Sequence, residues 1–231
     1  MKAFLLAAGN GTRLRPLTDT LPKCLVPIHG VPMLNIWLEV CRRGGIDEVL
    51  LNLHAHADVV RSSLTGVPNG LKVRAVEEPI LLGSAGTLLA NRDWVASEPH
   101  FWVLYGDVLT NTDLSKMLAY HRQGDFPITL GLTQVKDPSR CGVATFDKGS
   151  VITEFVEKPA NPSSNWAFSG VMLASPKALD GVRKPSPCDI GFDLLPHMLG
   201  RMRAYPISEY LLDIGTLENY ELAQRTWPGL G

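Results

Sequence analysis

The sequence has no long apolar run and no excess of charge of either sign. The apolar stretch near the N-terminus covers only residues 3–8, which is too short for a signal peptide or for a helix that crosses a membrane. Lys and Arg together number 22 and Asp and Glu 23, for a formal net charge of −1. Such a balance gives no electrostatic reason to expect nucleic acid or an anionic membrane as a partner. We therefore expect a cytoplasmic protein that binds neither.

Paired cysteines are also missing. The four cysteines, Cys24, Cys41, Cys141 and Cys188, are widely spaced and include no C-x-x-C pair. This spacing argues against a disulfide framework and against a structural zinc site. It predicts free thiols in a reducing compartment.

Two familiar phosphate-binding motifs are absent as well. The chain has no G-x-x-x-x-G-K-[ST] motif. Its Gly9-Asn10-Gly11 is followed by Leu14, where G-x-G-x-x-G requires a third glycine. The glycine-rich loop is therefore neither a P-loop nor a dinucleotide fingerprint, and its role has to be inferred from its own residues.

The first half of the sequence alternates between apolar runs and helical periodicity. The 231 residues, 45% of them apolar, suffice for one large α/β domain with a small lobe. Strands are predicted at 2–8, 48–53, 71–76 and 101–106, and helices at 31–45, 56–64, 85–94 and 113–122. This alternation predicts a doubly wound, mostly parallel, Rossmann-like sheet.

The pattern changes near residue 125. Strand-like runs at 126–135, 141–147, 150–158 and 167–175 follow one another with short polar joins, and a helix at 191–200, a strand at 203–206 and a helix at 216–226 complete the chain. Consecutive strands of this kind predict a mixed β lobe. We expect a single domain over 1–231, built from a part at about 1–125 and a part at about 126–231.

The loop after the first strand combines small residues with cations. The strand ends at Ala7 and Ala8, and ligands of parallel α/β sheets bind at the carboxyl ends of the strands. Glycines there let backbone amides approach a phosphate, and the Arg13 guanidinium and Lys23 ammonium can bind its oxygens. The alternative is a solvated turn that carries cations, but the run G-x-G-T-R-L-x-P-L-T followed by P-K favours a phosphate site.

Two aspartates follow apolar runs in positions suited to a metal ion. Asp107 lies just past the strand at 101–106, and Asp213 precedes the helix at 216–226. Mg²⁺ prefers one or two carboxylates together with phosphate and water oxygens. Each aspartate alone is equally compatible with a turn or helix N-cap. Two aspartates at separate strand ends suit a Mg²⁺ site, and the residues alone leave both interpretations open.

Taken together, these segments resemble a known family. "LAAGNGTRLRPLT" with "PKCLVPI" resembles the signature of the sugar-1-phosphate nucleotidylyltransferases, or NDP-sugar pyrophosphorylases, and "LYGDVL", "TEFVEKP" and "DIGTLENY" resemble further segments of that family. The resemblance implies a fold of the nucleotide-diphospho-sugar transferase type. It also implies that a sugar 1-phosphate attacks the α-phosphorus of an NTP and that pyrophosphate leaves, with Mg²⁺ as cofactor. The part at 1–125 would bind the NTP and the part at 126–231 the sugar phosphate.

The resemblance also assigns site residues by position. The catalytic residues that it implies are Arg13, Lys23, Asp107 and Asp213, with the two aspartates as metal ligands. The nucleotide-binding residues that it implies are Leu6, Ala7, Ala8, Gly9, Gly11, Thr12, Arg13, Glu78, Gly83, Ser84, Ala85 and Gly86. The sugar-phosphate residues that it implies are Gly142, Glu157, Lys158, Ser169 and Gly170.

The base and the sugar are indicated by two segments that disagree. "LGSAGTL" at 82–88 resembles guanylyltransferases that act on mannose 1-phosphate or manno-heptose 1-phosphate. Phe168-Ser169-Gly170 replaces the usual Asn-x-Gly and resembles uridylyltransferases that act on N-acetylmuramate 1-phosphate. GTP with a manno-configured sugar is favoured, and UTP with N-acetylmuramate 1-phosphate or another hexose 1-phosphate is the alternative. A phosphocholine cytidylyltransferase is disfavoured by the Glu-Lys-Pro at 157–159.

A function of another class is a non-catalytic subunit that senses nucleotides or sugars. Such a subunit is expected to lack one of the four catalytic residues, and all four are present. We also expect no C-terminal β-helix of the kind that larger relatives carry. A homodimer is compatible with the sequence.

Overall fold

The computed structural model describes residues 1–9 and 11–231. The chain separates into two compact units that are interleaved in sequence. Unit 1 comprises Met1–Leu81, Leu104–Ser115 and Glu209–Gly231, and unit 2 comprises Leu82–Val103 and Lys116–Ser208. Each unit is described by itself below. The expected single domain with parts 1–125 and 126–231 stays a prediction, and Asn10 of the glycine-rich loop lies outside the described residues.

Unit 1 is built around parallel strands. They are β1 (Lys2–Leu6), β4 (Glu48–Leu53) and β5 (Lys72–Glu77), in the order β1-β4-β5, with Lys2 opposite Glu48 and Glu48 opposite Lys72. The helices α1 (Met33–Arg43) and α2 (Ala57–Ser63) connect them. Because strands buried on both faces need apolar side chains throughout, β1 and β4 read as nearly continuous apolar runs.

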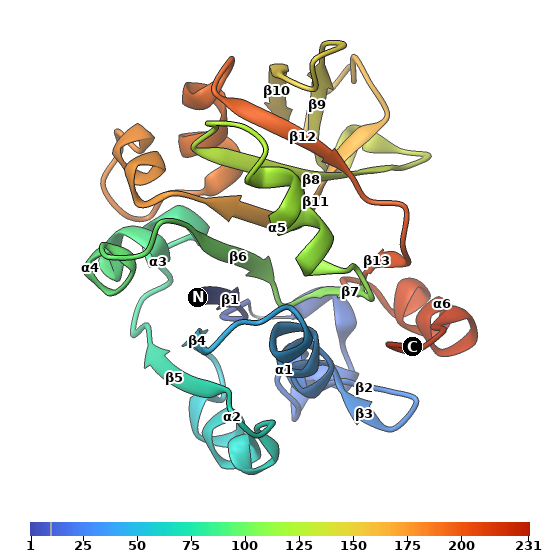
Figure 1. Ribbon diagram of the computed structural model, residues 1–231. Helices are drawn as coiled ribbons and strands as arrows, with labels where there is room; N and C mark the ends of the chain where they lie inside the picture. The colour runs from blue at the N-terminus through green and yellow to red at the C-terminus, as the bar shows by residue number, and fades with distance from the viewer. Residues whose placement is uncertain (10) are drawn as a thin grey trace. The chain divides into compact units, whose positions relative to one another are not determined.

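Short antiparallel pairs complete unit 1. They are β2 (Pro27–Ile28) with β3 (Val31–Pro32), and β7 (Val108–Thr110) with β13 (Leu211–Asp213). The chain then ends in α6 (Leu217–Thr226) (Figure 1). The strand β6 (Phe101–Tyr105) runs from unit 2 into unit 1, where the Gly106 amide donates to the Leu6 carbonyl at 2.8 Å.

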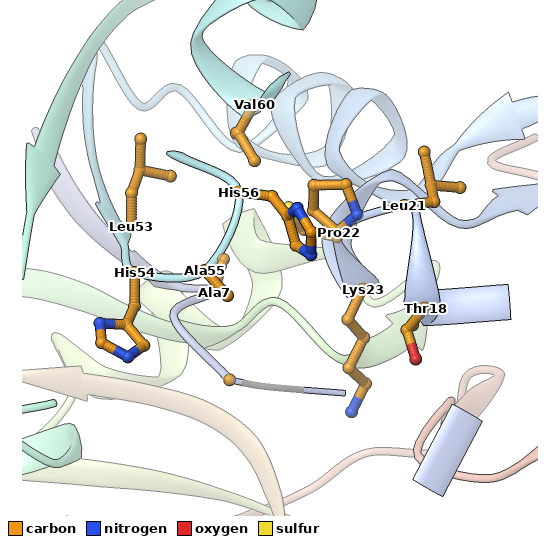
Figure 2. A pocket seen from close by; sticks show the side chains of 12 residues that line it. Ala7, Thr18, Leu21, Pro22, Lys23, Leu53, His54, Ala55, His56 and Val60 are labelled. Atoms are coloured by element: carbon orange, nitrogen blue, oxygen red, sulfur yellow. The ribbon is translucent and has the colours of Figure 1, made fainter. Parts of the chain in front are cut away.

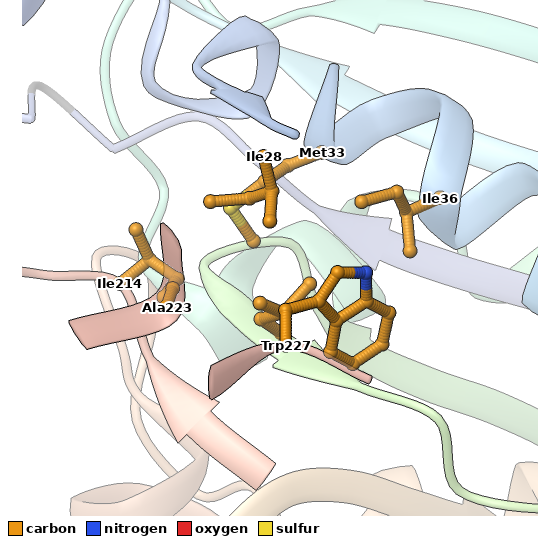
Figure 3. Close-up of a cluster of buried hydrophobic side chains, with 7 residues drawn as sticks. Ile28, Met33, Ile36, Ile214, Ala223 and Trp227 are labelled. Carbon is orange, nitrogen blue, oxygen red and sulfur yellow. The ribbon is translucent and has the colours of Figure 1, made fainter. Parts of the chain in front are cut away.

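A buried cluster in unit 1 anchors the end of the chain. Trp227 packs with Ile28, Met33 and Ile36, and also with Ile214, which directly follows β13 (Figure 3). Burying side chains of this size stabilises the fold by about 1.5–3 kcal/mol each. The cluster therefore holds β13, and with it Asp213, in a fixed place within unit 1.

Unit 2 is a mixed β structure with helices. Its strands are β8 (Ile128–Gln134), β9 (Gly142–Phe146), β10 (Ile152–Glu157), β11 (Trp166–Ala174) and β12 (Met202–Pro206). β10 pairs with β9, β9 with β11 and β11 with β8, all antiparallel, whereas β12 pairs with β8 in parallel (Figure 1). The helices are α3 (Ser84–Ala90), α4 (Arg92–Val95) and α5 (Leu114–His121), the last of which begins in unit 1. The predicted α/β class, with parallel strands in the first part and a mixed β lobe after it, is confirmed.

Two predicted helices differ from the structure. The segment expected as one helix at 191–200 is a π-helical turn (Ile190–Leu194) followed by a 3₁₀ turn (Leu195–Met198). Pro196 explains the break, since it has no N–H to donate to a preceding carbonyl. The helix expected at 85–94 divides at Asn91 into α3 and α4.

The remaining 3₁₀ turns are short. They are Thr12–Leu14, Leu17–Asp19, Lys23–Leu25, Leu64–Gly66, Pro138–Arg140 and Pro176–Gly181. All four cysteines are free thiols, as predicted. Within residues 1–9 and 11–231, none of the helices has both the length and the apolar character to cross a bilayer.

Candidate active site

A buried polar network ties together the strand ends of unit 1. The Ala7 amide donates to Asn52 Oδ1 at 2.7 Å, and Asn52 Nδ2 donates to Glu78 Oε1 at 3.0 Å. Asn52 and Glu78 are only 5% and 4% exposed. Glu78, a predicted nucleotide-binding residue, therefore lies in the interior and connects to the glycine-rich loop through Asn52. Asn52 was not among the predicted site residues, although a polar residue inside the apolar strand "EVLLNL" was a signal for it.

The described part of the glycine-rich loop beyond Asn10 curls from Gly11 back to Thr18. Gly11 has a φ of 63°, and a Cβ there would lie 3.0 Å from Thr18 Cγ2. The Thr18 hydroxyl donates to the Gly11 carbonyl at 2.7 Å and so holds the curl closed. Ala8 is buried, whereas Gly9, Thr12 and Arg13 are exposed. The loop thus presents a backbone and a guanidinium to solvent.

Lys23 and Asp107 form an ion pair in unit 1. Lys23 Nζ lies 2.7 Å from Asp107 Oδ2, and the two side chains are 11% and 37% exposed. Asp107 follows the end of β6, and its carbonyl accepts a hydrogen bond from the Ile214 amide at 2.8 Å. Two residues 84 positions apart in the sequence are thereby joined.

The pairing of β7 with β13 brings Asp213 close to Asp107, because Asp213 lies opposite Val108, the residue after Asp107. Burial by its surroundings, and then the negative charge of Asp107, raise the pKa of Asp213, while the cations Lys23 and Arg13 lower that pKa. Asp213 nonetheless keeps an exposed side. The other three predicted catalytic residues, Arg13, Lys23 and Asp107, therefore all act electrostatically on Asp213 within unit 1.

Gly215 lies between Asp213 and Arg13. A Cβ on Gly215 would be 2.8 Å from Asp213 Oδ1 and 3.0 Å from Arg13 Nη2. The absence of a side chain at Gly215 therefore leaves room for the Asp213 carboxylate and the Arg13 guanidinium where a Cβ would lie.

A small cavity of about 10 Å³ borders Lys23. Its wall includes Thr18 from the loop and His54 and His56 from the end of β4 (Figure 2). His54 Nδ1 lies 2.7 Å from the Glu78 carbonyl oxygen, so one of its ring nitrogens is engaged by the backbone. Among the residues that the structure describes, no three or more His, Cys, Asp or Glu side chains gather to hold a metal ion. His54 and His56 line the wall of this cavity.

In unit 2, the Glu157 carboxylate lies in a slot between two glycines. A Cβ on Gly142 would be 2.6 Å from Glu157 Oε2, and one on Gly191 would be 2.2 Å from the same oxygen. The Glu157 side chain is 16% exposed. Burial raises the pKa of Glu157 and the charge of Asp189 adds to this, whereas Lys158 opposes both. Gly191 was not among the predicted site residues.

Lys158 adopts an unusual backbone conformation next to that slot. Its φ is 50°, which is uncommon for a residue with a side chain. Its amide donates to the Cys141 carbonyl at 2.9 Å, and its Nζ lies 3.9 Å from Glu157 Oε1. Such outliers persist only where surrounding structure enforces them, and they are concentrated at functional sites.

The start of α3 is bound to the segment at 188–190. The amides of Ala85 and Gly86 donate to the Cys188 carbonyl at 3.0 and 3.1 Å. The Ser84 hydroxyl donates to Asp189 Oδ1 at 3.0 Å. Three groups predicted to bind the nucleotide are thus engaged inside unit 2, and their role at a ligand stays a prediction. We call these hydrogen bonds between the start of α3 and residues 188–190 the Cys188 bracket. They were not predicted, because they join segments about a hundred residues apart in the sequence.

The remaining sugar-site candidates lie in β11. Ser169 is 2% exposed, and its Oγ accepts a hydrogen bond from the Val171 amide at 3.2 Å. Gly170 has a φ of 77°, where the pairing of β11 with β8 is interrupted between Phe168 and Met172. Ser169 therefore shapes the strand through its hydroxyl, and Gly170 supplies the left-handed backbone.

Two relatives with similar sequences are named as mannose-1-phosphate guanylyltransferases. A mannose-1-phosphate guanyltransferase of Schizosaccharomyces pombe is 32% identical in an alignment that covers 95% of this chain and 62% of that protein. The mannose-1-phosphate guanylyltransferase 1 of Arabidopsis thaliana is 32% identical over 95% of this chain and 63% of its own length. This chain therefore spans about three fifths of the length of these relatives.

Two solved structures have folds similar to that of this chain. HddC from Yersinia pseudotuberculosis, complexed with GMP-PN, has a TM-score of 0.80 and 26% identity, over 98% of this chain and 99% of that one. A Bacillus anthracis protein in complex with sucrose, provisionally described as a glucose-1-phosphate thymidylyltransferase, has a TM-score of 0.87 and 25% identity, over 97% and 94%. Residues 2–227 match the Nucleotidyl transferase family as a whole. The chain belongs to the nucleotidyl transferase family.

Proposed function

We propose that this protein transfers a guanylyl group from GTP to a sugar 1-phosphate of manno configuration, giving GDP-sugar and pyrophosphate. The observation that carries the proposal is the grouping of Arg13, Lys23, Asp107 and Asp213 in unit 1, from three separate stretches of the chain. The relatives named as mannose-1-phosphate guanylyltransferases support the choice of substrates.

On the nucleotide side, the proposed roles follow from charge and position. Arg13 is exposed next to the glycine-rich loop and is suited to bind phosphate oxygens in the forked geometry of a guanidinium. Lys23 is largely buried and held by Asp107, so its ammonium is fixed where charge develops on the transferred phosphate. No covalent intermediate is required.

Asp107 and Asp213 fit a divalent cation. Burial and then the negative charge of Asp107 raise the pKa of Asp213, and a bound cation would offset the cost of keeping the Asp213 carboxylate charged. Mg²⁺ is commonly held by one or two carboxylates plus phosphate and water oxygens, which matches a two-carboxylate site. When bound, the ion would neutralise charge on the triphosphate and its leaving group.

On the sugar side, Glu157 and Lys158 of unit 2 supply an acceptor for hydroxyls and a cation for the phosphate. The Glu157 carboxylate is held in its slot between Gly142 and Gly191, whereas the Lys158 side chain is 60% exposed and available to an anion. A phosphate oxygen of the sugar phosphate forms a bond to the α-phosphorus as the bond to the pyrophosphate oxygen breaks. That phosphate is already ionised at neutral pH, so no strong general base is needed.

The test is pyrophosphate release with Mg²⁺ over a grid of substrates. One axis is GTP, UTP, dTTP, CTP and ATP, and the other is mannose, manno-heptose, glucose, N-acetylglucosamine and N-acetylmuramate 1-phosphates. We expect one strong combination of GTP with a manno-configured sugar. A maximum with UTP would favour the alternative suggested by Phe168-Ser169-Gly170. No release in any combination, with nucleotide binding retained in a thermal-shift assay, would favour a sensing subunit.

The proposal also includes expectations about the cellular location and the oligomeric state of the protein. We expect the protein to act in the cytoplasm, where nucleoside triphosphates are available. A homodimer is expected to appear in light scattering coupled to size exclusion as a mass of about twice 25.2 kDa.

A further inference from the structure

Phe192 is an aromatic ring left open to solvent in unit 2. It is 54% exposed and is the one aromatic residue among the exposed large apolar side chains of the part of the chain that the structure describes. Leaving so much apolar surface in water forgoes the gain of burying it, about 25 cal/mol per Å². Nothing in the packing of unit 2 accounts for this exposure.

The backbone that carries Phe192 is firmly held. The Ile190 amide donates to the Ser84 hydroxyl oxygen at 2.8 Å. The Asp189 amide donates to Asp193 Oδ2 at 2.8 Å, and the Asp193 amide donates to the Asp189 carbonyl at 2.7 Å. The segment on both sides of Phe192 is thus pinned, so the ring is presented by an ordered turn. This turn is π-helical, a feature frequent at functional sites.

The ring lies beside the two polar groups of the proposed sugar site. Lys158 Nζ is 5.9 Å from the centre of the Phe192 ring. The neighbouring Gly191 lies against Glu157 so closely that a Cβ would be 2.2 Å from the carboxylate oxygen Oε2. A carboxylate, an ammonium and an exposed aromatic ring therefore border one region of unit 2.

This combination suits the pyranose ring of a sugar phosphate. The hydroxyls of a sugar need hydrogen-bond partners, and its C–H groups form apolar patches. Small-molecule sites usually join a few placed polar groups to hydrophobic and aromatic walls. Glu157 supplies the acceptor and Phe192 the wall, while Lys158 can reach a phosphate.

We propose that Phe192 is a specificity-determining residue of the sugar 1-phosphate site and packs its ring against the C–H face of the pyranose. The inference rests on the proposed function and deepens it. Covering roughly 50 Å² of apolar surface changes affinity by about tenfold. Phe192→Ala is therefore expected to raise the KM for mannose 1-phosphate about tenfold, with kcat and the KM for GTP within about twofold.

The experiment measures initial rates of pyrophosphate release with GTP saturating and mannose 1-phosphate varied. Phe192→Trp is expected to keep a KM close to that of the wild type, because it restores an aromatic ring. Leu199→Ala, which truncates another exposed apolar side chain of unit 2, serves as the matched control and is expected to change nothing. Inorganic phosphate, added as a competitive inhibitor, reports on the phosphate subsite alone.

The outcomes separate cleanly. If Phe192→Ala leaves the KM for mannose 1-phosphate unchanged in an active enzyme, the inference is wrong and the proposed function stands. If Phe192→Ala weakens inhibition by inorganic phosphate as much as it weakens binding of mannose 1-phosphate, the ring acts through Lys158 and does not contact the sugar. If the wild type turns over no sugar 1-phosphate, the proposed function fails and this inference falls with it.

Discussion

At the scale of single residues, Lys23 is the side chain on which the proposed chemistry depends most. It is 11% exposed and bonded to Asp107, so its charge is preorganised. Removing one preorganised group that stabilises transition-state charge costs about 10²–10³ in kcat. Lys23→Ala is expected to lose turnover by that factor in a steady-state assay while remaining folded by circular dichroism. Lys148→Ala, in an exposed turn of unit 2, is the control, and equal rates for both variants would remove Lys23 from the mechanism.

The two aspartates make a second prediction at this scale. Asp107→Asn and Asp213→Asn each keep the shape of the side chain but remove a charge that Mg²⁺ binds. We expect each to lower kcat by at least about 100-fold and to raise the Mg²⁺ concentration needed for half-maximal activity. Initial rates over a Mg²⁺ titration measure both quantities, with the exposed Asp125→Asn as control. A variant with normal Mg²⁺ dependence would show that its carboxylate does not bind the ion.

At the scale of elements, the slot around Glu157 depends on the turn at Gly191. A Cβ at this position would lie 2.2 Å from Glu157 Oε2, at the far end of a flexible side chain. Gly191→Ala is therefore expected to push the carboxylate aside without unfolding unit 2, and to raise the KM for the sugar phosphate more than that for GTP. Gly66→Ala, whose Cβ would meet only Asn35 Nδ2 at 3.6 Å, is the control. An unchanged KM would mean that Glu157 does not contact the sugar.

The bracket between α3 and the segment at 188–190 predicts a different effect. Gly83 has a φ of 76°, and a Cβ would lie 2.4 Å from the Cys188 carbonyl oxygen, which is backbone and cannot easily move. Gly83→Ala is expected to destabilise the protein by about 2–4 kcal/mol, from the backbone conformation and the clash together. Urea unfolding compared with the wild type measures the difference. A loss under about 0.5 kcal/mol, as for an ordinary surface change, would show that the bracket does not constrain this turn.

At the scale of the whole molecule, a buried histidine couples stability to pH. Burial lowers the pKa of His121 to about 4, and the nearby His100, Arg122 and Arg203 act in the same direction. Between pH 6.5 and about 4, His121 is therefore protonated in the unfolded chain but neutral in the folded chain. The contribution of neutral His121 is complete above pH 6.5 and is lost as the pH falls toward 4.

Urea unfolding between pH 7.5 and 4.5 measures this dependence. We expect the free energy of unfolding of the wild type to fall with pH across this range. His121→Gln keeps a group that can bond Thr129 Oγ1, which lies 2.8 Å from His121 Nδ1, and is expected to flatten the curve. Identical slopes for the two proteins would assign the acid sensitivity to other groups.

Some features of this molecule could be predicted from its sequence, and others could not. The parallel strands could be predicted from local apolar patterns, and the family could be predicted from contiguous motifs such as the glycine-rich loop. The same motifs led to Arg13, Lys23, Asp107 and Asp213, whose catalytic roles stay predictions. Three other features could not be predicted: the hydrogen bonds of Asn52, the position of the Glu157 carboxylate against Gly191, and the hydrogen bonds from the start of α3 to the Cys188 carbonyl. Each depends on contacts between segments far apart in the sequence, and these contacts leave no local periodicity.

The most direct test of the account follows the atoms of the reaction. Mannose 1-phosphate labelled with ¹⁸O in its non-bridging phosphate oxygens is incubated with GTP, Mg²⁺ and the protein, and the products are analysed by mass spectrometry. If a sugar-phosphate oxygen attacks the α-phosphorus, all of the label appears in GDP-mannose and none in pyrophosphate. Label in pyrophosphate, or the absence of a GDP-sugar with both mannose 1-phosphate and manno-heptose 1-phosphate, would contradict the proposed guanylyl transfer.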